Sequence, residues 1–221
     1  MRTSSDILHD LRSVLSDPAN VAASGHPGGN AGRVKMTHMD ELNKIASLHF
    51  RDTQAAAVSI SGRNLPLIYK LISSLVSPPL CKTLMVLDLD GRFDATRITC
   101  AEEHLHHVYV QRPAHSSPET VRTLVADAQG FMLYNAASQA SLSRQWWGTI
   151  VIGGLGSAGD LVAGWKGWLR VDREPVQPFA LGISSDEALT QRKARQDAVD
   201  AAGWAATSPW GGFVFHEMDG D

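Results

Sequence analysis

The chain has few cysteines, no long apolar run and little net charge. Its only cysteines, Cys81 and Cys100, form neither a disulfide framework nor a paired metal-ligand spacing. No segment approaches the ~18 consecutive apolar residues of a membrane span, and residues 1–6 lack the apolar stretch of a secretory signal. The net charge is −3, so no overall basic charge points to nucleic acid. We therefore expect an intracellular protein with no membrane association, whose contacts with DNA are local or are supplied by a partner.

Apolar segments alternate in character from Ala55 onward. The 221 residues are 43% hydrophobic, enough for one full α/β domain or two small ones. Strands are predicted at Ala55–Ile60, Thr83–Leu89, His107–Val110 and Trp147–Ile152, with helices at Leu65–Val76 and from Ser117 to Gly130. This alternation implies right-handed crossovers and a mostly parallel sheet covered by helices on both faces.

The C-terminal third has a different pattern. Short strands are predicted close together at Trp168–Val171, Pro178–Ile183 and Gly212–Phe215. A helix is predicted over Asp186–Ala202, because Ser184 and Glu187 have the spacing of a capping box and Gly203 follows the helix. Closely spaced strands favour an antiparallel extension at one edge of the sheet.

The first part of the chain is predicted to be separate from the sheet. Ser5–Leu15 and Met39–Phe50 have helical periodicity, and the intervening Ala23–Arg33 is rich in glycine. We therefore predict a short N-terminal helical arm with a glycine-rich loop over residues 1–52 and a core domain over 53–221.

The segment Leu84–Arg97 is the most informative part of the sequence. It is a buried strand that ends in Asp88 and Asp90 at a glycine turn, the position where α/β nucleotide-binding folds carry their chemistry. On one interpretation Asp90 positions an attacking water. On the other, Asp88 and Asp90 only shape the turn.

Two anchors that nucleotide hydrolysis needs are missing. The turn after Ala55–Ile60 retains Gly62 but has no second glycine and no Lys-Ser/Thr pair; Arg63 and Lys70 are the nearest cations, and Lys70 falls inside the next helix. The strand Thr149–Ile152 runs into two glycines, where a hydrolase places an aspartate for its Mg²⁺. We therefore favour the turn interpretation and expect no enzymatic activity, no cofactor and no metal.

The acidic motif resembles that of a known family. Asp88-Leu-Asp90-Gly-Arg-Phe93-x-x-x-Arg97 resembles the segment that follows the P-loop helix in RecA-type recombinases. It is most similar to the eukaryotic paralogues of homologous recombination, including the short, X-ray-repair cross-complementing type. The order of elements over residues 55–215 is also similar. The resemblance implies a RecA-like core domain with Asp90 in the position of the catalytic carboxylate and a nucleotide-site remnant, which comprises Gly62, Arg63, Lys70, Asp88 and Asp90.

Six tryptophans in the second half are candidate interface residues: Trp146, Trp147, Trp165, Trp168, Trp204 and Trp210. Burial at the sheet edge explains them most simply. Alternatively they form a partner interface, because Trp is common in binding hot spots, or stack on single-stranded DNA near Lys166 and Arg170. Protein contact ranks above DNA contact because the chain is acidic. The cluster His104, His106 and His107 is interpreted as structural, since no second ligand cluster accompanies it.

These features predict a nuclear, non-catalytic accessory protein of double-strand break repair by homologous recombination. It would form a heteromer with other recombinase-like subunits and support recombinase filaments on single-stranded DNA, with direct or indirect DNA contact. One alternative is a RecA-fold structural subunit of another assembly. Another is a divergent nucleotide hydrolase that uses Arg63, Lys70 and Asp90.

Overall fold

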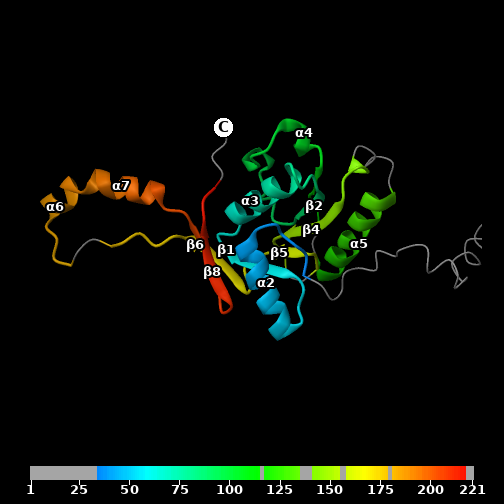
Figure 1. Cartoon of the computed structure of the whole chain (residues 1–221), viewed down its shortest axis with the longest axis horizontal. Helices are drawn as coiled ribbons and strands as arrows, with labels where there is room; N and C mark the ends of the chain where they lie inside the picture. Colours follow the sequence, from blue (N-terminus) through cyan, green and yellow to red (C-terminus); the bar gives the residue numbers. More distant parts are fainter. Residues whose placement is uncertain (1–33, 115–116, 135–140, 155–157, 179–180, 218–221) are drawn as a thin grey trace, which may run out of the picture. The chain divides into compact units, whose positions relative to one another are not determined.

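An eight-stranded sheet forms the centre of the fold (Figure 1). The computed structural model describes residues 34–114, 117–134, 141–154, 158–178 and 181–217. The strands are β1 (Val58–Gly62), β2 (Thr83–Asp88), β3 (Val108–Gln111), β4 (Trp146–Ile152), β5 (Leu161–Ala163), β6 (Leu169–Arg173), β7 (Trp204–Ser208) and β8 (Gly211–Phe215). Their order is β3-β2-β4-β5-β1-β6-β7-β8. Strands β1 to β6 pair in parallel, whereas β7 is antiparallel to β6 and β8. The predicted α/β class, mostly parallel sheet and antiparallel C-terminal extension are confirmed.

Helices cover both faces of the parallel part of the sheet. They are α2 (Asp40–Thr53), α3 (Leu65–Val76), α4 (Glu102–Leu105), α5 (Pro118–Tyr134), α6 (Ser185–Thr190) and α7 (Arg192–Ala201), together with the 3₁₀ turn η1 (Ala95–Arg97). Helices α2 and α3 pack on one face and α5 on the other. Successive residues of β2 show the two faces, because Val86 belongs to the α3 cluster and Leu87 to the α5 cluster. A strand buried on both faces needs apolar residues at successive positions, which explains the continuous apolar run of β2.

Helix α2 packs on the sheet. Leu42 and Ala46 belong to the same hydrophobic cluster as β1 and α3, and the compact unit of the chain begins at Val34. This helix was predicted as part of an N-terminal arm, whereas its apolar face is buried against the sheet. The predicted helix Ser5–Leu15 and the glycine-rich loop lie outside the described residues.

Four elements of the C-terminal third differ from the prediction. The strand expected at Pro178–Ile183 is wrong for its described residues: Pro178 cannot donate to a strand ladder, and Gly182 has a φ of +84° that suits a turn. The partner of β6 is instead β7. The helix expected over Asp186–Ala202 is divided into α6 and α7 at Gln191, although the capping box of Ser184 and Glu187 is confirmed. The three-residue β5 and the strand β7 were not predicted.

Candidate functional site at the carboxyl edge of the sheet

A pocket of about 490 Å³ lies where β1, β2, β4 and β5 end. Its lining residues come from the last residue of β1 and from the loops that follow these strands: Gly62, Asn64, Asp90, Arg92, Gly153, Gly154, Gly164 and Trp165. The carboxyl ends of parallel strands are where α/β folds form ligand crevices. The fold thus brings together three features that are far apart in sequence: the glycine at the end of β1, the acidic turn after β2 and the glycine pair after β4.

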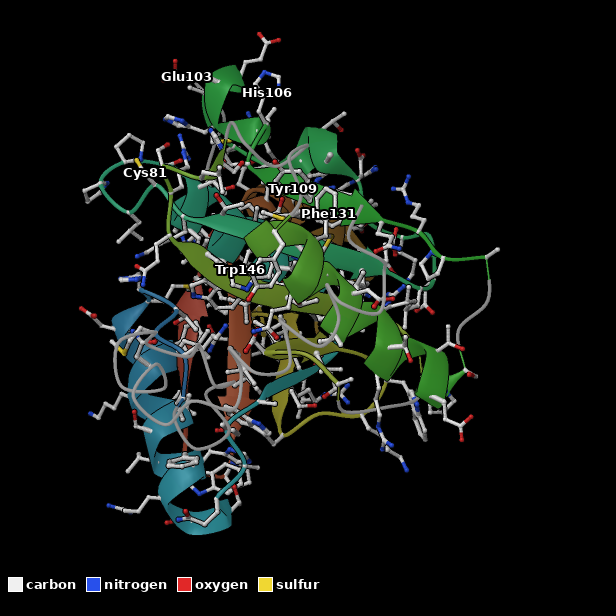
Figure 2. The ribbon with its side chains drawn as sticks, turned by 90° about the vertical axis from the view of Figure 1, so that its right-hand side faces the viewer. Cys81, Glu103, His106, Tyr109, Phe131 and Trp146 are labelled. Atoms are coloured by element: carbon white, nitrogen blue, oxygen red, sulfur yellow. The ribbon has the colours of Figure 1, made fainter. Side chains whose placement is uncertain are left out.

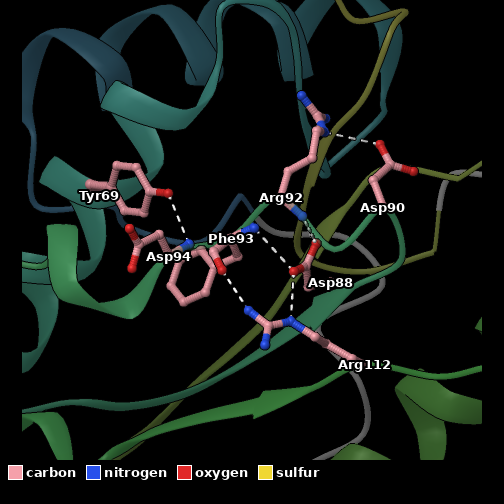
Figure 3. Close-up of polar contacts among 7 residues, drawn as sticks. All are labelled: Tyr69, Asp88, Asp90, Arg92, Phe93, Asp94 and Arg112. Carbon is pink, nitrogen blue, oxygen red and sulfur yellow. Dashed lines mark hydrogen bonds and ion pairs between the residues drawn. The ribbon is translucent and has the colours of Figure 1, made fainter.

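Asp88 organises the turn after β2 (Figure 3). Its side chain is 0% exposed and accepts backbone hydrogen bonds from Arg92 (3.1 Å) and Phe93 (3.0 Å). The Nε of Arg112 lies 3.0 Å from Asp88 Oδ2, and the same guanidinium donates to the Phe93 carbonyl at 2.5 Å. Asp88 is therefore occupied by internal donors. The role of Arg112 was not predicted, because nothing local in the sequence links it to a carboxylate 24 residues earlier.

The turn is also fixed from the side of α3. Phe93 is buried, and its ring lies 5.5 Å from that of Tyr69. The Tyr69 hydroxyl accepts a hydrogen bond from the backbone N–H of Asp94 at 3.0 Å. The aromatic residue of the motif is thus a packing anchor for the acidic turn.

Asp90 lies inside the pocket and fills space beside β4. Its side chain is 42% exposed, and its Oδ2 lies 3.2 Å from Arg92 Nε. A Cβ on Gly153 would come within 2.1 Å of the Asp90 Cγ, and Gly153 has a φ of +83°, which L-residues rarely adopt. Two separate constraints, backbone conformation and contact with Asp90, therefore favour glycine where a hydrolase needs a metal-binding carboxylate.

The connection from β1 to α3 is too short to surround a phosphate chain. Only Arg63 and Asn64 separate the two elements. The Arg63 N–H donates to the Val171 carbonyl at 2.7 Å, and a Cβ on Gly62 (φ +75°) would lie 2.4 Å from that same oxygen. Gly62 is thus required by the close approach of β6, whatever the pocket holds.

Asn64 connects this turn to the end of β5. It is buried, and its Nδ2 donates to the Gly164 carbonyl at 3.3 Å, whereas its Oδ1 has no partner in the described part of the chain. The first turn of α3 contains Pro66, which removes one backbone donor from the helix N-terminus. This end of the pocket therefore has one N–H group fewer than an ordinary helix N-terminus.

The predicted cations do not line the pocket. Lys70 Nζ donates to the His216 carbonyl at 3.0 Å, beyond the end of β8, and the Arg63 side chain is exposed. The cation that lines it is Arg92, which belongs to the acidic motif but was not predicted as a site residue. Of the five predicted remnant residues, Gly62 and Asp90 line the pocket and Asp88 supports it.

Most of the six tryptophans have intramolecular partners. Trp147 and Trp204 are buried, and their indole N–H groups donate to the Met36 carbonyl (2.8 Å) and to Glu217 (3.0 Å). Figure 2 shows Trp146 on the α5 side of the sheet, where it packs in the same cluster as Tyr109 and Phe131. These three tryptophans are core and strand-end residues, as the simpler interpretation predicted.

Trp168 and Trp210 form an aromatic cluster with His49 of α2. The His49 ring stacks on Trp168 with centroids 4.3 Å apart and meets Trp210 edge-on at 4.6 Å. Burial lowers the pKa of His49 below its usual 6.5. The remaining tryptophan, Trp165, is 66% exposed at the rim of the pocket, and Lys166 Nζ lies 4.3 Å from the centre of its ring.

The histidine cluster near β3 makes hydrogen bonds within the protein. His107 Nδ1 lies 2.8 Å from Ser141 Oγ, and His104 Nδ1 lies 3.0 Å from Arg144 Nη2. Burial, followed by the charge of Arg144, lowers the pKa of His107. Among the described residues, no three His, Cys, Asp or Glu side chains converge as metal ligands, and no helix is both long and apolar enough to span a membrane.

No family model matches the chain, and a search of curated proteins finds no match. The chemistry of the site therefore rests on its own geometry. The pocket has one carboxylate, Asp90, paired with one guanidinium, Arg92, and its other lining side chains are the amide of Asn64 and the indole of Trp165. This set can bind a small polar or aromatic group, but the lining residues include neither a lysine nor a second carboxylate.

Proposed function

We propose that this protein is a non-catalytic RecA-like subunit that supports homologous recombination through assembly with other recombinase-like proteins. The observation that carries the proposal is the contact between Asp90 and Gly153. The acidic turn resembles that of the recombinases, and the position opposite it has no room for a larger side chain such as a metal-binding carboxylate.

The topology supports RecA-like ancestry. In this sheet β4 and β5 lie between β2 and β1, β6 follows on the other side of β1, and β7 is antiparallel. The resemblance implies a mostly parallel sheet with an antiparallel C-terminal part, and this sheet has both features. The topology therefore agrees with the resemblance carried by the motif from Asp88 to Arg97.

The pocket argues against nucleotide hydrolysis. Phosphoryl transfer depends on several charges that hold the phosphates and a metal in line with the nucleophile. Here the β1–α3 turn is short and bonded to β6, Lys70 is engaged elsewhere, and Asp90 is paired with Arg92. One carboxylate without phosphate and metal anchors cannot perform the reaction. We therefore infer that the protein acts through its surface.

Trp165 is the strongest candidate for that surface. It lies on the connection between β5 and β6, is largely exposed, and has the Lys166 ammonium over its ring. Exposed tryptophan next to a cation suits a binding hot spot on a partner protein and also stacking with a base of single-stranded DNA. Because the chain is acidic, we place partner protein first and local DNA contact second.

The test is purification of the tagged full chain from nuclear extract with identification of bound proteins. Trp165→Ala is compared with Leu142→Ala, a truncation of another exposed apolar side chain (60% exposed). We expect recombinase-like subunits with the wild type and with Leu142→Ala, and much less with Trp165→Ala. Recovery of an unrelated assembly in their place would favour the structural-subunit alternative and contradict the proposal.

A nucleotide assay addresses the hydrolase alternative separately. A ligand at a hundredfold its Kd stabilises the folded state by about 2.7 kcal/mol. We expect ATP with Mg²⁺ to produce no such shift in thermal unfolding and no phosphate release. Hydrolysis that Asp90→Ala abolishes would refute the non-catalytic assignment.

A further inference from the structure

The outer edge of β8 is unpaired within the described part of the chain. Strand β8 is the last strand of the sheet and pairs only with β7. Its sequence, Gly-Gly-Phe-Val-Phe, contains no charged residue and no proline, the features that usually protect a free edge from another strand. Val214 is 52% exposed. The opposite edge, β3, is followed directly by Arg112 and carries the polar Gln111.

The alternation of hydrogen-bonded and non-bonded pairs along β6, β7 and β8 shows which backbone groups of β8 point outward. The Val171 carbonyl accepts from Arg63 on the β1 side of β6, so residue 171 faces away from β7. Antiparallel strands alternate between hydrogen-bonded and non-bonded pairs. Ala206, opposite Val171, therefore bonds to Phe213 of β8. It follows that Gly212 and Val214 direct their N–H and C=O groups to the free edge.

We propose that β8 pairs antiparallel with β8 of a second copy of this chain, which makes one continuous sheet across a two-fold axis at Phe213. In this register Gly212 lies opposite Val214 of the partner copy, and each of these residues exchanges both backbone hydrogen bonds with its opposite. An interface that uses the same patch on both copies is the usual form of a two-fold dimer.

Side chains on the exposed face of β8 fit this register. Gly212 must be glycine, because a Cβ there would lie 2.8 Å from the Ala206 carbonyl. The Val214 side chain of the partner copy would lie over this glycine, which has no side chain to clash with it. No like charges meet, since β8 has no charged residue. Self-pairing thus satisfies both the backbone groups and the exposed valine.

The association should be reversible. Strand β8 contributes only five residues from each copy, against roughly 20–30 on each side of a standard interface, so the dimer should dissociate on dilution. Sedimentation equilibrium over a dilution series of the full chain should therefore show the mass rising from 23.9 kDa toward twice that value.

Two variants of Val214 test the edge. Val214→Pro removes an outward N–H without removing a bond to β7, and Val214→Lys adds a charge at the edge. Both should remain at 23.9 kDa at concentrations where the wild type dimerises. Val110→Lys on β3, where Val110 is 39% exposed, is the matched control and should dimerise like the wild type. Far-UV circular dichroism checks that each variant is folded.

Amide hydrogen exchange distinguishes the possible occupants of the edge. With self-pairing, exchange at Gly212 and Val214 slows as concentration rises. A wild type that remains monomeric throughout the series would overturn the proposal, as would a dimer that both Val214 variants retain. Slow exchange at these amides in a monomer would show that another segment of the same chain covers the edge, which also overturns it.

Discussion

Gly153→Ala tests the central feature of the pocket, the contact between residue 153 and Asp90. A non-glycine residue in the left-handed conformation costs roughly 1–2 kcal/mol. Because the new Cβ would lie 2.1 Å from the Asp90 Cγ, Asp90 must also leave its position, at a further ~1 kcal/mol for an altered rotamer and the lost pairing with Arg92. We expect a total destabilisation of about 2–3 kcal/mol, measured by guanidinium denaturation.

Gly91→Ala is the matched control for this substitution. Gly91 also has a positive φ (+67°), but nothing lies within 4 Å of the position of its Cβ. Gly91→Ala should lower the free energy of unfolding only by the cost of the left-handed backbone conformation, roughly 1–2 kcal/mol. In an Asp90→Ala background the excess cost of Gly153→Ala should disappear. If Gly153→Ala costs no more than Gly91→Ala, or if the excess persists without Asp90, our account of why residue 153 is glycine is wrong.

Three further predictions concern other parts of the molecule. Asp88→Ala should reduce the free energy of unfolding by about 2–4 kcal/mol in chemical denaturation, because two backbone donors and Arg112 lose their buried acceptor; a loss below 1 kcal/mol would contradict the role of Asp88 in the turn. Burial lowers the pKa of His49 below 6.5, so as the pH falls the unfolded state takes up a proton at this residue before the folded state does. The free energy of unfolding therefore keeps its full His49 contribution above pH 6.5 and decreases as the pH falls from 6.5 toward the folded-state pKa. His49→Phe keeps the ring but does not titrate, so urea midpoints between pH 7.5 and 5 should decrease less than in the wild type; equal slopes would refute the assignment. Trp165→Ala should change stability by less than about 0.5 kcal/mol, whereas Trp147→Ala should cost about 3–5 kcal/mol; similar losses would show that Trp165 is part of the core.

The parts of the fold that could be predicted are those whose cause is local. The apolar run of β2, the capping box at Ser184 and the acidic turn each have a signal within a few neighbouring residues. The missed features depend on which distant segments meet. Arg112 reaches Asp88 only because β3 lies beside β2, and His49 meets Trp168 only after α2 packs on the sheet.

The same reasoning applies to the candidate site. The sequence alone shows that no Gly-Lys-Ser/Thr motif follows β1 and that glycines, not an aspartate, follow β4. It could not show that Asp90 fills the space at Gly153, or that Lys70 is bonded to the chain beyond β8. Side-chain direction depends on tertiary packing. Residue type alone therefore could not show that Arg63, Lys70 and Asp88 do not line the pocket.

The segment between β6 and β7 offers a place to re-engineer the chain. Arg173 pairs with Trp204, and the Glu174 N–H donates to the Gly203 carbonyl at 3.0 Å, so the chain leaves and re-enters the sheet one strand spacing apart. The intervening helices α6 and α7 contain no buried residue. A short hairpin turn can therefore replace them, because closing neighbouring strand ends needs only a few residues. The same junction can accept a fluorescent domain or new chain termini without interrupting the sheet.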